Sequence, residues 1–355
     1  MAASARGAGR LLLTGVPGWL SHALLLDLER EPLPGLTAVR CLLEPTQAAR
    51  TRLDAYRGPL PVEGVVGDLR SPASLAAALD GVDLVLHAAG LLHVRRTRDW
   101  YDVNTRGTEH LASVAAQAHT KRFVLISSNA AAGKSERAER LLTEAEPPRP
   151  LSHYGRSKWL AEQALLAYAG RFEAVILRPS MFYGPPVPDR HIDVYRRLQT
   201  GVMPLVGDGN FARSLTYIDN LVQGCRLALS HPAAAGQTYY IADRPAYTTR
   251  RVVEAMAAAL DTAPRYLRLP RLVGPLAYTT DMALARLGLY WQTLHLVGES
   301  DWHVGVSSQK AVDELGYTPS MELEEGMRRA VAWCYETGKL QPTSWSPALN
   351  ESAGA

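Results

Sequence analysis

The sequence has few cysteines and no long uninterrupted apolar run, and both absences narrow the class of protein. The three cysteines of the 355-residue chain, Cys41, Cys225 and Cys334, lie far apart and match no metal-ligand or redox spacing. We therefore expect buried, reduced thiols, no metal site and a cytoplasmic protein. The N-terminal apolar run is too short for a signal peptide. Charged residues interrupt the apolar stretch at 272–291, so no integral membrane segment is predicted.

The chain also lacks an excess of charge of either sign. Lysine and arginine number 38 against 35 aspartates and glutamates, which gives a net charge of +3. No basic block stands out, so nucleic acid is not an expected partner. With 47% hydrophobic residues the chain can bury a large core, and its length suits two domains or one domain with an appendage.

Short apolar runs alternate with Ala- and Leu-rich segments of helical length. Unbroken apolar runs are typical of strands buried on both faces of a parallel sheet, and this repetition predicts a doubly wound α/β fold of the Rossmann type. After residue 180 the pattern loosens. We expect a dinucleotide-binding domain over 1–180, a smaller C-terminal substrate-binding region interleaved with it over 181–340, and a tail over 341–355. The predicted strands lie in RLLLTG, AVRCLL, VEGVVGD, VDLVLHAAG, RFVLISS and AVILRPS.

A glycine-rich turn joins the first predicted strand to a candidate helix at 19–30. Glycine permits a tight turn and a close approach of phosphate to the backbone, and the helix N-terminus offers N–H groups to a pyrophosphate. Ser21 occupies the place where a third glycine usually stands, and serine is small enough to preserve close packing. The alternative is an ordinary strand–helix turn. The expected cofactor-binding residues here are Thr14, Gly15, Gly18, Trp19 and Leu20.

Three further strand ends indicate a dinucleotide. The Asp68 carboxylate could accept a hydrogen bond from an adenine amino group. The small residues that follow His87 would let the backbone pass close to a ligand, and we assign no chemistry to His87 itself. Glu44 ends the second strand, where a carboxylate accepts from ribose hydroxyls and repels a 2′-phosphate. This favours NAD and leaves NADP possible; the alternative is a solvent-facing glutamate. The residues expected near the cofactor are Asp68, Leu69, Ala88, Ala89 and Gly90, with Glu44.

Tyr154 and Lys158 are one helical turn apart and therefore face the same way. An ammonium group stabilises phenolate and lowers the pKa of the tyrosine, and it can also hold the nicotinamide ribose. Ser127 and Ser128 end a predicted buried strand, where α/β sites gather. A hydroxyl there could orient the substrate oxygen.

These residues resemble the extended short-chain dehydrogenase/reductase family over roughly 10–335. The resemblance implies that Tyr154 is the general acid/base, that Lys158 lowers its pKa, and that Ser128 completes the triad with Ser127 as its rival. It also implies that Ser127, Tyr154, Lys158 and Pro179 contact the cofactor. Ser21 departs from the family's glycine pattern. Further matching segments are VNTRGTEHL centred on Asn104, LRPSMFYGP, RSLTYIDNLVQGCRLAL and SSQKAVDELGYTP.

The residue that follows the sixth predicted strand helps to distinguish the branches of this family. Sugar-nucleotide enzymes of the family carry an asparagine there, whereas this chain has Met181, which suits an apolar ligand. The segment 266–297 fits either a lipid-accepting lid or a second-domain core. Arg213 favours the sugar-nucleotide branch, in which the matching arginine meets phosphate. The expected substrate-binding residues are Ser128, Asn129, Met181, Phe182 and Arg213.

We therefore expect an NAD(P)-dependent oxidoreductase that transfers a hydride between nicotinamide and a secondary alcohol or ketone on an apolar substrate. That substrate would be a 3β-hydroxysteroid-like or alkyl β-hydroxy/keto compound. A sugar-nucleotide epimerase or dehydratase is the first alternative, and a non-catalytic dinucleotide-binding sensor is the second. The resemblance also implies a homodimer that pairs through the helices near 100–118 and 153–169.

Overall fold

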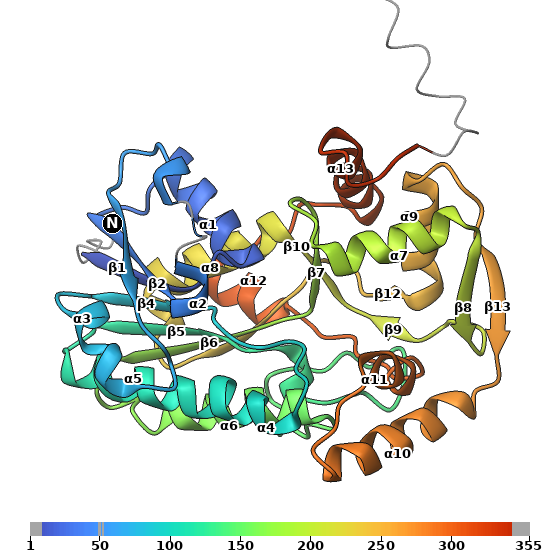
Figure 1. Cartoon of the computed structure of the whole chain (residues 1–355), viewed down its shortest axis with the longest axis horizontal. Helices are drawn as coiled ribbons and strands as arrows, with labels where there is room; N and C mark the ends of the chain where they lie inside the picture. Colours follow the sequence, from blue (N-terminus) through green and yellow to red (C-terminus); the bar gives the residue numbers. More distant parts are fainter. Residues whose placement is uncertain (1–8, 49–50, 52, 343–355) are drawn as a thin grey trace, which may run out of the picture.

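A seven-stranded, wholly parallel sheet forms the centre of the computed structural model, which describes residues 9–48, 51 and 53–342 (Figure 1). Its strand order is β11-β6-β5-β4-β1-β2-β3, so the order reverses beside β1. Ligands of open α/β sheets bind at such a reversal, outside the carboxyl ends of the strands. The strands are β1 (Arg10–Val16), β2 (Ala38–Leu43), β3 (Val62–Val66), β4 (Leu84–His87), β5 (Arg122–Ile126), β6 (Glu173–Pro179) and β11 (Thr238–Ile241).

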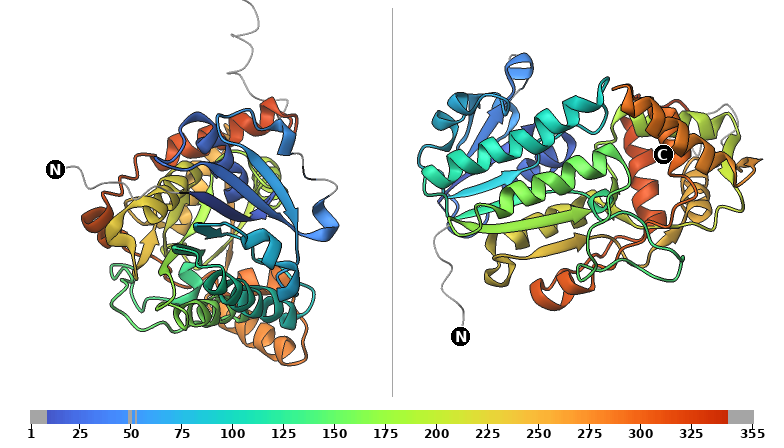
Figure 2. Two further views of the ribbon diagram at one scale, coloured as in Figure 1. Left: turned by 90° about the vertical axis from the view of Figure 1, so that its left-hand side faces the viewer. Right: turned by 90° about the horizontal axis from the view of Figure 1, so that it is seen from below.

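Helices cover both faces of this sheet, which confirms the predicted doubly wound Rossmann-type fold (Figures 1 and 2). One face packs against α1 (Trp19–Arg30), α8 (Ile218–Ser230) and α12 (Gln309–Leu315). The other packs against α3 (Ala76–Leu79), α5 (Gly107–Gln117) and α6 (His153–Leu166). Because α8 and β11 come late in the sequence, the chain returns to the sheet after it has built much of the second region.

Burial of the strands follows their place in the sheet. Every residue of β4 and β5 is buried, as expected for strands covered on both faces. The prediction of burial on both faces is wrong for β3, where Val66 remains 55% exposed. This strand is the edge of the sheet and pairs with β2 alone, so it has less cover than its neighbours.

The second region has a separate small core, which includes Tyr195, Val253 and Val331. The segment at 134–140 is irregular and largely exposed. No helix in the described part of the chain is long and apolar enough to cross a membrane. The three cysteines are free and buried. The remaining elements are α2 (Pro45–Ala48), α4 (Thr97–Trp100), α7 (Asp189–Gln199), α9 (Thr249–Ala259), α10 (Val273–Arg286), α11 (Gln292–Gly298), α13 (Leu323–Glu336), β7 (Met181–Tyr183), β8 (Val202–Val206), β9 (Ala212–Arg213), β10 (Leu215–Tyr217), β12 (Tyr247–Thr248) and β13 (Arg265–Leu269).

A buried ion pair ties β6 to α6 beside the end of β5. The Arg178 guanidinium donates to both carboxylate oxygens of Glu162, at 2.9 and 2.6 Å. The Ser127 hydroxyl donates to the same carboxylate at 2.5 Å. All three residues are buried, so the ion pair fixes α6 against β6, and the Ser127 hydrogen bond connects both to the end of β5.

We expect Glu162→Gln to destabilise the fold by about 3–5 kcal/mol, because the change leaves a buried arginine without its counter-charge. Urea denaturation followed by circular dichroism measures this as a lower midpoint with an unchanged slope. Glu109→Gln, on the exposed face of α5, is the matched control and should shift stability by at most about 0.5 kcal/mol. Equal midpoints for the two variants would contradict a stabilising role for the pair.

Candidate active site

The glycine-rich turn between β1 and α1 requires both of its glycines. Gly15 has a φ of 84°, and a Cβ there would lie 2.8 Å from the backbone nitrogen of Ala89. A Cβ on Gly18 would lie 2.5 Å from the carbonyl oxygen of Gly15. Ser21 is buried and its hydroxyl donates to the Thr14 carbonyl at 2.9 Å, so serine in the third position preserves close packing of helix on strand. The first N–H groups of α1 have no intrahelical acceptor and lie where a pyrophosphate can bind.

A buried chain of hydrogen bonds starts at this turn. The Ala89 N–H donates to Thr14 Oγ1 at 3.0 Å, and the Thr14 hydroxyl donates to His87 Nδ1 at 2.8 Å. The other ring nitrogen, Nε2, donates to Thr108 Oγ1 at 3.0 Å, and that hydroxyl donates to the Asn104 carbonyl at 2.6 Å. The chain therefore fixes a neutral imidazole with its proton on Nε2, and burial lowers the pKa of His87 to about 3. This fits the absence of a catalytic assignment for His87.

The Asn104 carboxamide extends the chain to the catalytic helix. It lies in a π-helical turn, Tyr101–Arg106, a geometry that recurs at functional sites. Its Oδ1 accepts from the Leu91 N–H at 2.7 Å, and its Nδ2 donates to Ser157 Oγ at 3.1 Å. The Ser157 hydroxyl then donates to the Tyr154 carbonyl at 2.7 Å. In the sequence, Asn104 was identified through the family resemblance alone, and nothing indicated a role for Ser157.

Lys158 lies on α6 with its ammonium group inside the protein. Its Nζ donates to the carbonyl oxygen of Ile126, at the end of β5, at 2.7 Å. A Cβ on Gly90 would lie 3.5 Å from the same Nζ, so this glycine after β4 borders the lysine. Burial lowers the pKa of Lys158 to about 8.

Ser128 lies against the phenol of Tyr154, and the two expected serines have separate partners. Burial raises the pKa of Tyr154 to about 12, while a hydrogen bond with Ser128 and the charge of Arg190 oppose that rise. The sequence predicts that Lys158 lowers this pKa, but its ammonium group is bonded to the Ile126 carbonyl. Ser127 is committed to Glu162. The geometry therefore favours Ser128 for the triad.

Trp100 at the end of α4 and Tyr290 from the second region form one wall beside Tyr154, the expected acid/base. The Trp100 ring lies 6.3 Å from the Tyr154 ring and 4.7 Å from the Tyr290 ring, between centroids. Behind this wall His295 contacts Asp281 at 2.8 Å and Glu299 at 3.3 Å. Burial alone would lower the pKa of His295, but these two acidic neighbours raise it above its usual range. No cluster of three or more potential metal ligands occurs in the described ranges.

Arg190 is a second residue that the sequence reasoning missed. Its guanidinium carbon lies 5.8 Å from the centre of the Trp19 ring, and Trp19 begins α1 and contacts Phe182 at 4.9 Å between centroids. The arginine is exposed and forms no ion pair with any described residue. Its charge therefore lies between the glycine-rich turn and Tyr154. The cluster of prolines just before it was the one available signal, and it indicated no chemistry.

Charged residues gather where the adenosine is expected. The Asp68 carboxylate pairs with Arg70 at 2.6 Å, which holds the pKa of Asp68 below its usual range. Glu44 Oε2 accepts from the Thr46 N–H at 3.0 Å, and its other oxygen lies 4.0 Å from Arg70. Glu44 is thus part of a loop network and is more than a free surface carboxylate. Leu69 follows Asp68, is buried and accepts from His110 at 2.8 Å through its carbonyl.

The expected substrate residues are spread along the second region's border. Met181 is 52% exposed directly after β6, whose last residue is the buried Pro179. Asn129 donates to the Val304 carbonyl at 3.5 Å. Arg213 donates through Nη2 to the carbonyls of Glu299 and Ser300, at 2.9 and 3.0 Å. These carbonyls use part of the donor capacity with which Arg213 would bind a phosphate.

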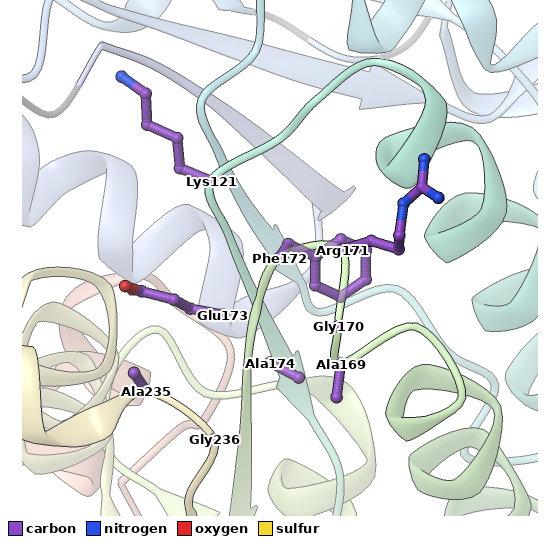
Figure 3. A pocket seen from close by; sticks show the side chains of 9 residues that line it. All are labelled: Lys121, Ala169, Gly170, Arg171, Phe172, Glu173, Ala174, Ala235 and Gly236. Atoms are coloured by element: carbon purple, nitrogen blue, oxygen red, sulfur yellow. The ribbon is translucent and has the colours of Figure 1, made fainter.

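A shallow pocket of about 420 Å³ lies elsewhere, at the amino ends of β5 and β6 (Figure 3). Two of its charged residues have partners, since Lys121 pairs with Asp83 at 2.7 Å and Glu173 pairs with Arg122 at 2.6 Å. The candidate catalytic residues follow the carboxyl ends of the same strands. The pocket is therefore separate from the candidate active site.

Comparison with known proteins assigns the family. The model of the NAD dependent epimerase/dehydratase family matches residues 11–242, and the chain belongs to that family. It is 34% identical to the uncharacterized protein y4nL of Sinorhizobium fredii, with 93% of this chain and 96% of that protein covered. It is 30% identical to UDP-glucose 4-epimerase of Vibrio cholerae, with 74% and 80% covered. It is 27% identical to 2-alkyl-3-oxoalkanoate reductase of Stenotrophomonas maltophilia, with 91% and 98% covered.

A similar solved structure indicates which cofactor the enzyme uses. The dTDP-glucose 4,6-dehydratase DesIV of Streptomyces venezuelae, solved with NAD bound, is 25% identical, with a TM-score of 0.72 over 94% of this chain and 99% of that one. The chain is therefore an NAD-dependent enzyme of the extended short-chain dehydrogenase/reductase class, as the sequence motifs indicate. The glycine turn fits NAD, because it places the N-terminus of α1, whose first N–H groups can bind a pyrophosphate, at the carboxyl end of β1. NAD supplies a hydride acceptor when bound.

Tyr154→Phe tests the assignment of the acid/base. The change removes only the hydroxyl, so NAD affinity and the melting temperature should stay close to wild type. Turnover should fall on the order of 10²-fold or more, because proton transfer to the substrate oxygen is lost. Spectrophotometry of the nicotinamide absorbance gives the rate, and calorimetry gives the NAD affinity.

Tyr101→Phe is the matched control for that variant. The Tyr101 hydroxyl bonds to His153 Nδ1 at 2.8 Å on the same part of α6 and is not part of the catalytic triad. We expect nearly wild-type turnover. Similar losses in both tyrosine variants would show that Tyr154 acts through the structure of the region and would remove its catalytic assignment.

Proposed function

We propose that this enzyme oxidises or reduces a secondary alcohol or ketone on an apolar substrate, such as a sterol-like or alkyl β-hydroxy/keto compound. The observation that carries the proposal is Met181, whose side chain is 52% exposed at the exit of β6. A nucleotide diphosphate at this position would need hydrogen-bond donors, because burial of unpaired charge is costly. A thioether supplies apolar surface and no donor.

The neighbouring side chains extend this apolar surface. Phe182 is half-buried against Trp19, and on the other side of Tyr154 the half-buried Tyr290 packs against the buried Trp100. Aromatic rings of this kind favour a ligand with a large apolar body. The 2-alkyl-3-oxoalkanoate reductase relative, which matches nearly the whole chain, supports the same class of substrate.

The residues of the site have separate roles in this proposal. In the direction of oxidation, bound NAD would accept the hydride of the carbinol carbon, and the phenolate form of Tyr154 would take the hydroxyl proton at Oη. Ser128, which hydrogen-bonds Tyr154, holds the substrate oxygen at that position. Lys158, whose Nζ donates to the Ile126 carbonyl beside Gly90, would hold the nicotinamide ribose. In the direction of reduction the neutral phenol donates its proton to the ketone oxygen, and its raised pKa keeps it in that protonated form.

A sugar-nucleotide epimerase or dehydratase is the second candidate. Arg190 presents an exposed guanidinium group close to Tyr154, and such a group can pair with phosphate. The UDP-glucose 4-epimerase relative is the stronger of the two functional matches in identity. The position of Arg190 beside Trp19 also suits the pyrophosphate of the cofactor, and we propose that role for it. Pairing as a homodimer through the segments 100–118 and 153–169 remains a prediction.

A substrate panel with a matched pair of variants decides between the two candidates. NAD-dependent absorbance change should appear with sterols or 2-alkyl-3-hydroxy acids and stay at background with UDP-sugars. Met181→Asn should lower kcat/KM for the apolar substrate by roughly tenfold, the equivalent of losing about 1.5 kcal/mol of apolar burial. Val202→Asn, at a 46% exposed position on β8, should leave kcat/KM unchanged.

The opposite pattern would reject the proposal. Turnover of a UDP-sugar without turnover of any apolar alcohol or ketone would establish the second candidate. Unchanged kcat/KM in Met181→Asn would show that the substrate does not touch this side chain.

A further inference from the structure

The outer face of α10 carries almost no charge. Leu272, Leu276 and Leu287 are 79%, 69% and 75% exposed. Between Arg271 and Arg286 the one charged residue is Asp281, which is buried. A helix on the surface of a globular protein ordinarily presents polar and charged residues to water. The exposed face of α10 therefore has the composition of a contact surface.

The remaining exposed positions on this face suit an apolar environment. Residues 272, 276, 283 and 287 share one side of the helix, because their spacings follow its period. Thr279 and Thr280 lie between them, and their hydroxyls donate to the Leu276 carbonyl at 2.9 and 2.8 Å. With these hydroxyls satisfied inside the helix, loss of water from the face leaves no threonine donor unpaired.

The apolar face continues onto the next segment. Leu289, Trp291 and Leu296 are 52%, 63% and 56% exposed. A backbone hydrogen bond of 3.3 Å from Thr97 to Gly288 fastens this segment to the loop before α4. In Figure 1 and in the left view of Figure 2, α10 lies along the lower margin of the molecule. We name the following set the apolar rim: Leu272, Leu276, Leu287, Leu289, Trp291 and Leu296.

Arginines flank the apolar rim. Arg286 is exposed at the end of α10, and Arg96 forms a backbone bridge with Leu289. The Arg271 guanidinium pairs with the Asp208 carboxylate at 3.4 Å. The Asp281 carboxylate is buried in contact with His295. Over residues 265–296 the exposed charged side chains are therefore all arginines. The exposed arginines are Arg95, Arg96, Arg265, Arg268, Arg271 and Arg286.

We infer that the apolar rim docks on the surface of an anionic lipid bilayer. Exposed leucines and a tryptophan between arginines are the composition of segments that lie in the membrane interface, and arginines near such a surface are attracted to anionic headgroups. A second copy of the chain is the less suitable partner. In a twofold contact the same arginines would face one another, with few exposed carboxylates to pair with them.

Docking by the rim would bring the candidate active site close to the bilayer. Tyr290 lies between Leu289 and Trp291 in the sequence, and its ring contacts Trp100, which in turn contacts Tyr154. The rim and the catalytic tyrosine are thus joined by a short run of aromatic contacts. Docking itself does not depend on the proposed substrate class, so the binding test is independent of any activity assay.

Vesicle flotation of the full chain tests the inference. We expect the protein to float with vesicles made of an equal mixture of phosphatidylcholine and phosphatidylglycerol. Binding to phosphatidylcholine alone should be weaker, and added salt should weaken binding to the mixed vesicles.

Two matched pairs of variants test whether the apolar rim is the surface that binds the vesicles. Leu276→Glu should lower the partition coefficient roughly tenfold or more, whereas Leu166→Glu, at a 41% exposed leucine on α6, should not. Arg286→Glu should lower it by roughly tenfold, whereas Arg171→Glu, an exposed arginine at the opposite end of the sheet, should have little effect. Thermal melts and NAD affinity verify that each variant is folded.

Three outcomes would overturn the inference. Wild-type protein that stays with the aqueous phase for both kinds of vesicle does not dock on bilayers. Equal losses in the rim variants and their controls would show that the rim is not the binding surface. A wild-type oligomer that Leu276→Glu converts to a smaller species in sedimentation velocity, without vesicle binding, would assign the rim to a second copy of the chain.

Discussion

One buried chain of hydrogen bonds sets the position of the glycine-rich turn relative to the catalytic helix. It starts at the Ala89 N–H, passes through the Thr14 hydroxyl and the His87 ring, and ends through Asn104 and Ser157 at the Tyr154 carbonyl. Each member donates to the next acceptor, so no polar atom along it is left to bear the roughly 1–3 kcal/mol cost of burial without a partner. Because Ser157 lies between the expected catalytic residues on α6, the chain places both Tyr154 and Lys158.

The chemistry of the site depends on which polar groups take part in structural hydrogen bonds and which remain beside the Tyr154 phenol. Glu162 and Arg178 take Ser127 into a buried structural network, which leaves Ser128 beside the phenol. Lys158 is anchored on a strand-end carbonyl, so its position is fixed independently of the tyrosine. The raised pKa keeps the phenol protonated, as an acid that donates to a ketone oxygen requires. Tyr290, which packs against Trp100 near Tyr154, lies in the sequence between Leu289 and Trp291 of the apolar rim. The proposed substrate site and the proposed docking surface are therefore adjacent.

The sequence predicts the parts of this structure that depend on short segments. Strand ends, the glycine turn and the spacing of Tyr154 and Lys158 are local features, and the helix expected at 19–30 has those bounds in the structure. The segment 266–297 shows the limit. Its apolar residues fitted either a lid or a second-domain core, and composition could not reveal that α10 leaves several leucines in water. Arg190, Tyr290 and Glu299 were missed because folding of the second region, which has no regular period, brings them to Tyr154.

The state of His87 tests the hydrogen-bond chain most directly. Nitrogen NMR of the protein labelled in its histidine rings, with His87 assigned by comparison with His87→Gln, reports the tautomer and its titration. The account predicts a neutral ring with its proton on Nε2 from about pH 8 to about pH 5. The Thr14 donor at Nδ1 and the Thr108 acceptor at Nε2 fix that form, and the usual pKa near 6.5 is lowered far below this range. A ring that carries its proton on Nδ1, or that titrates near the usual pKa, would contradict it.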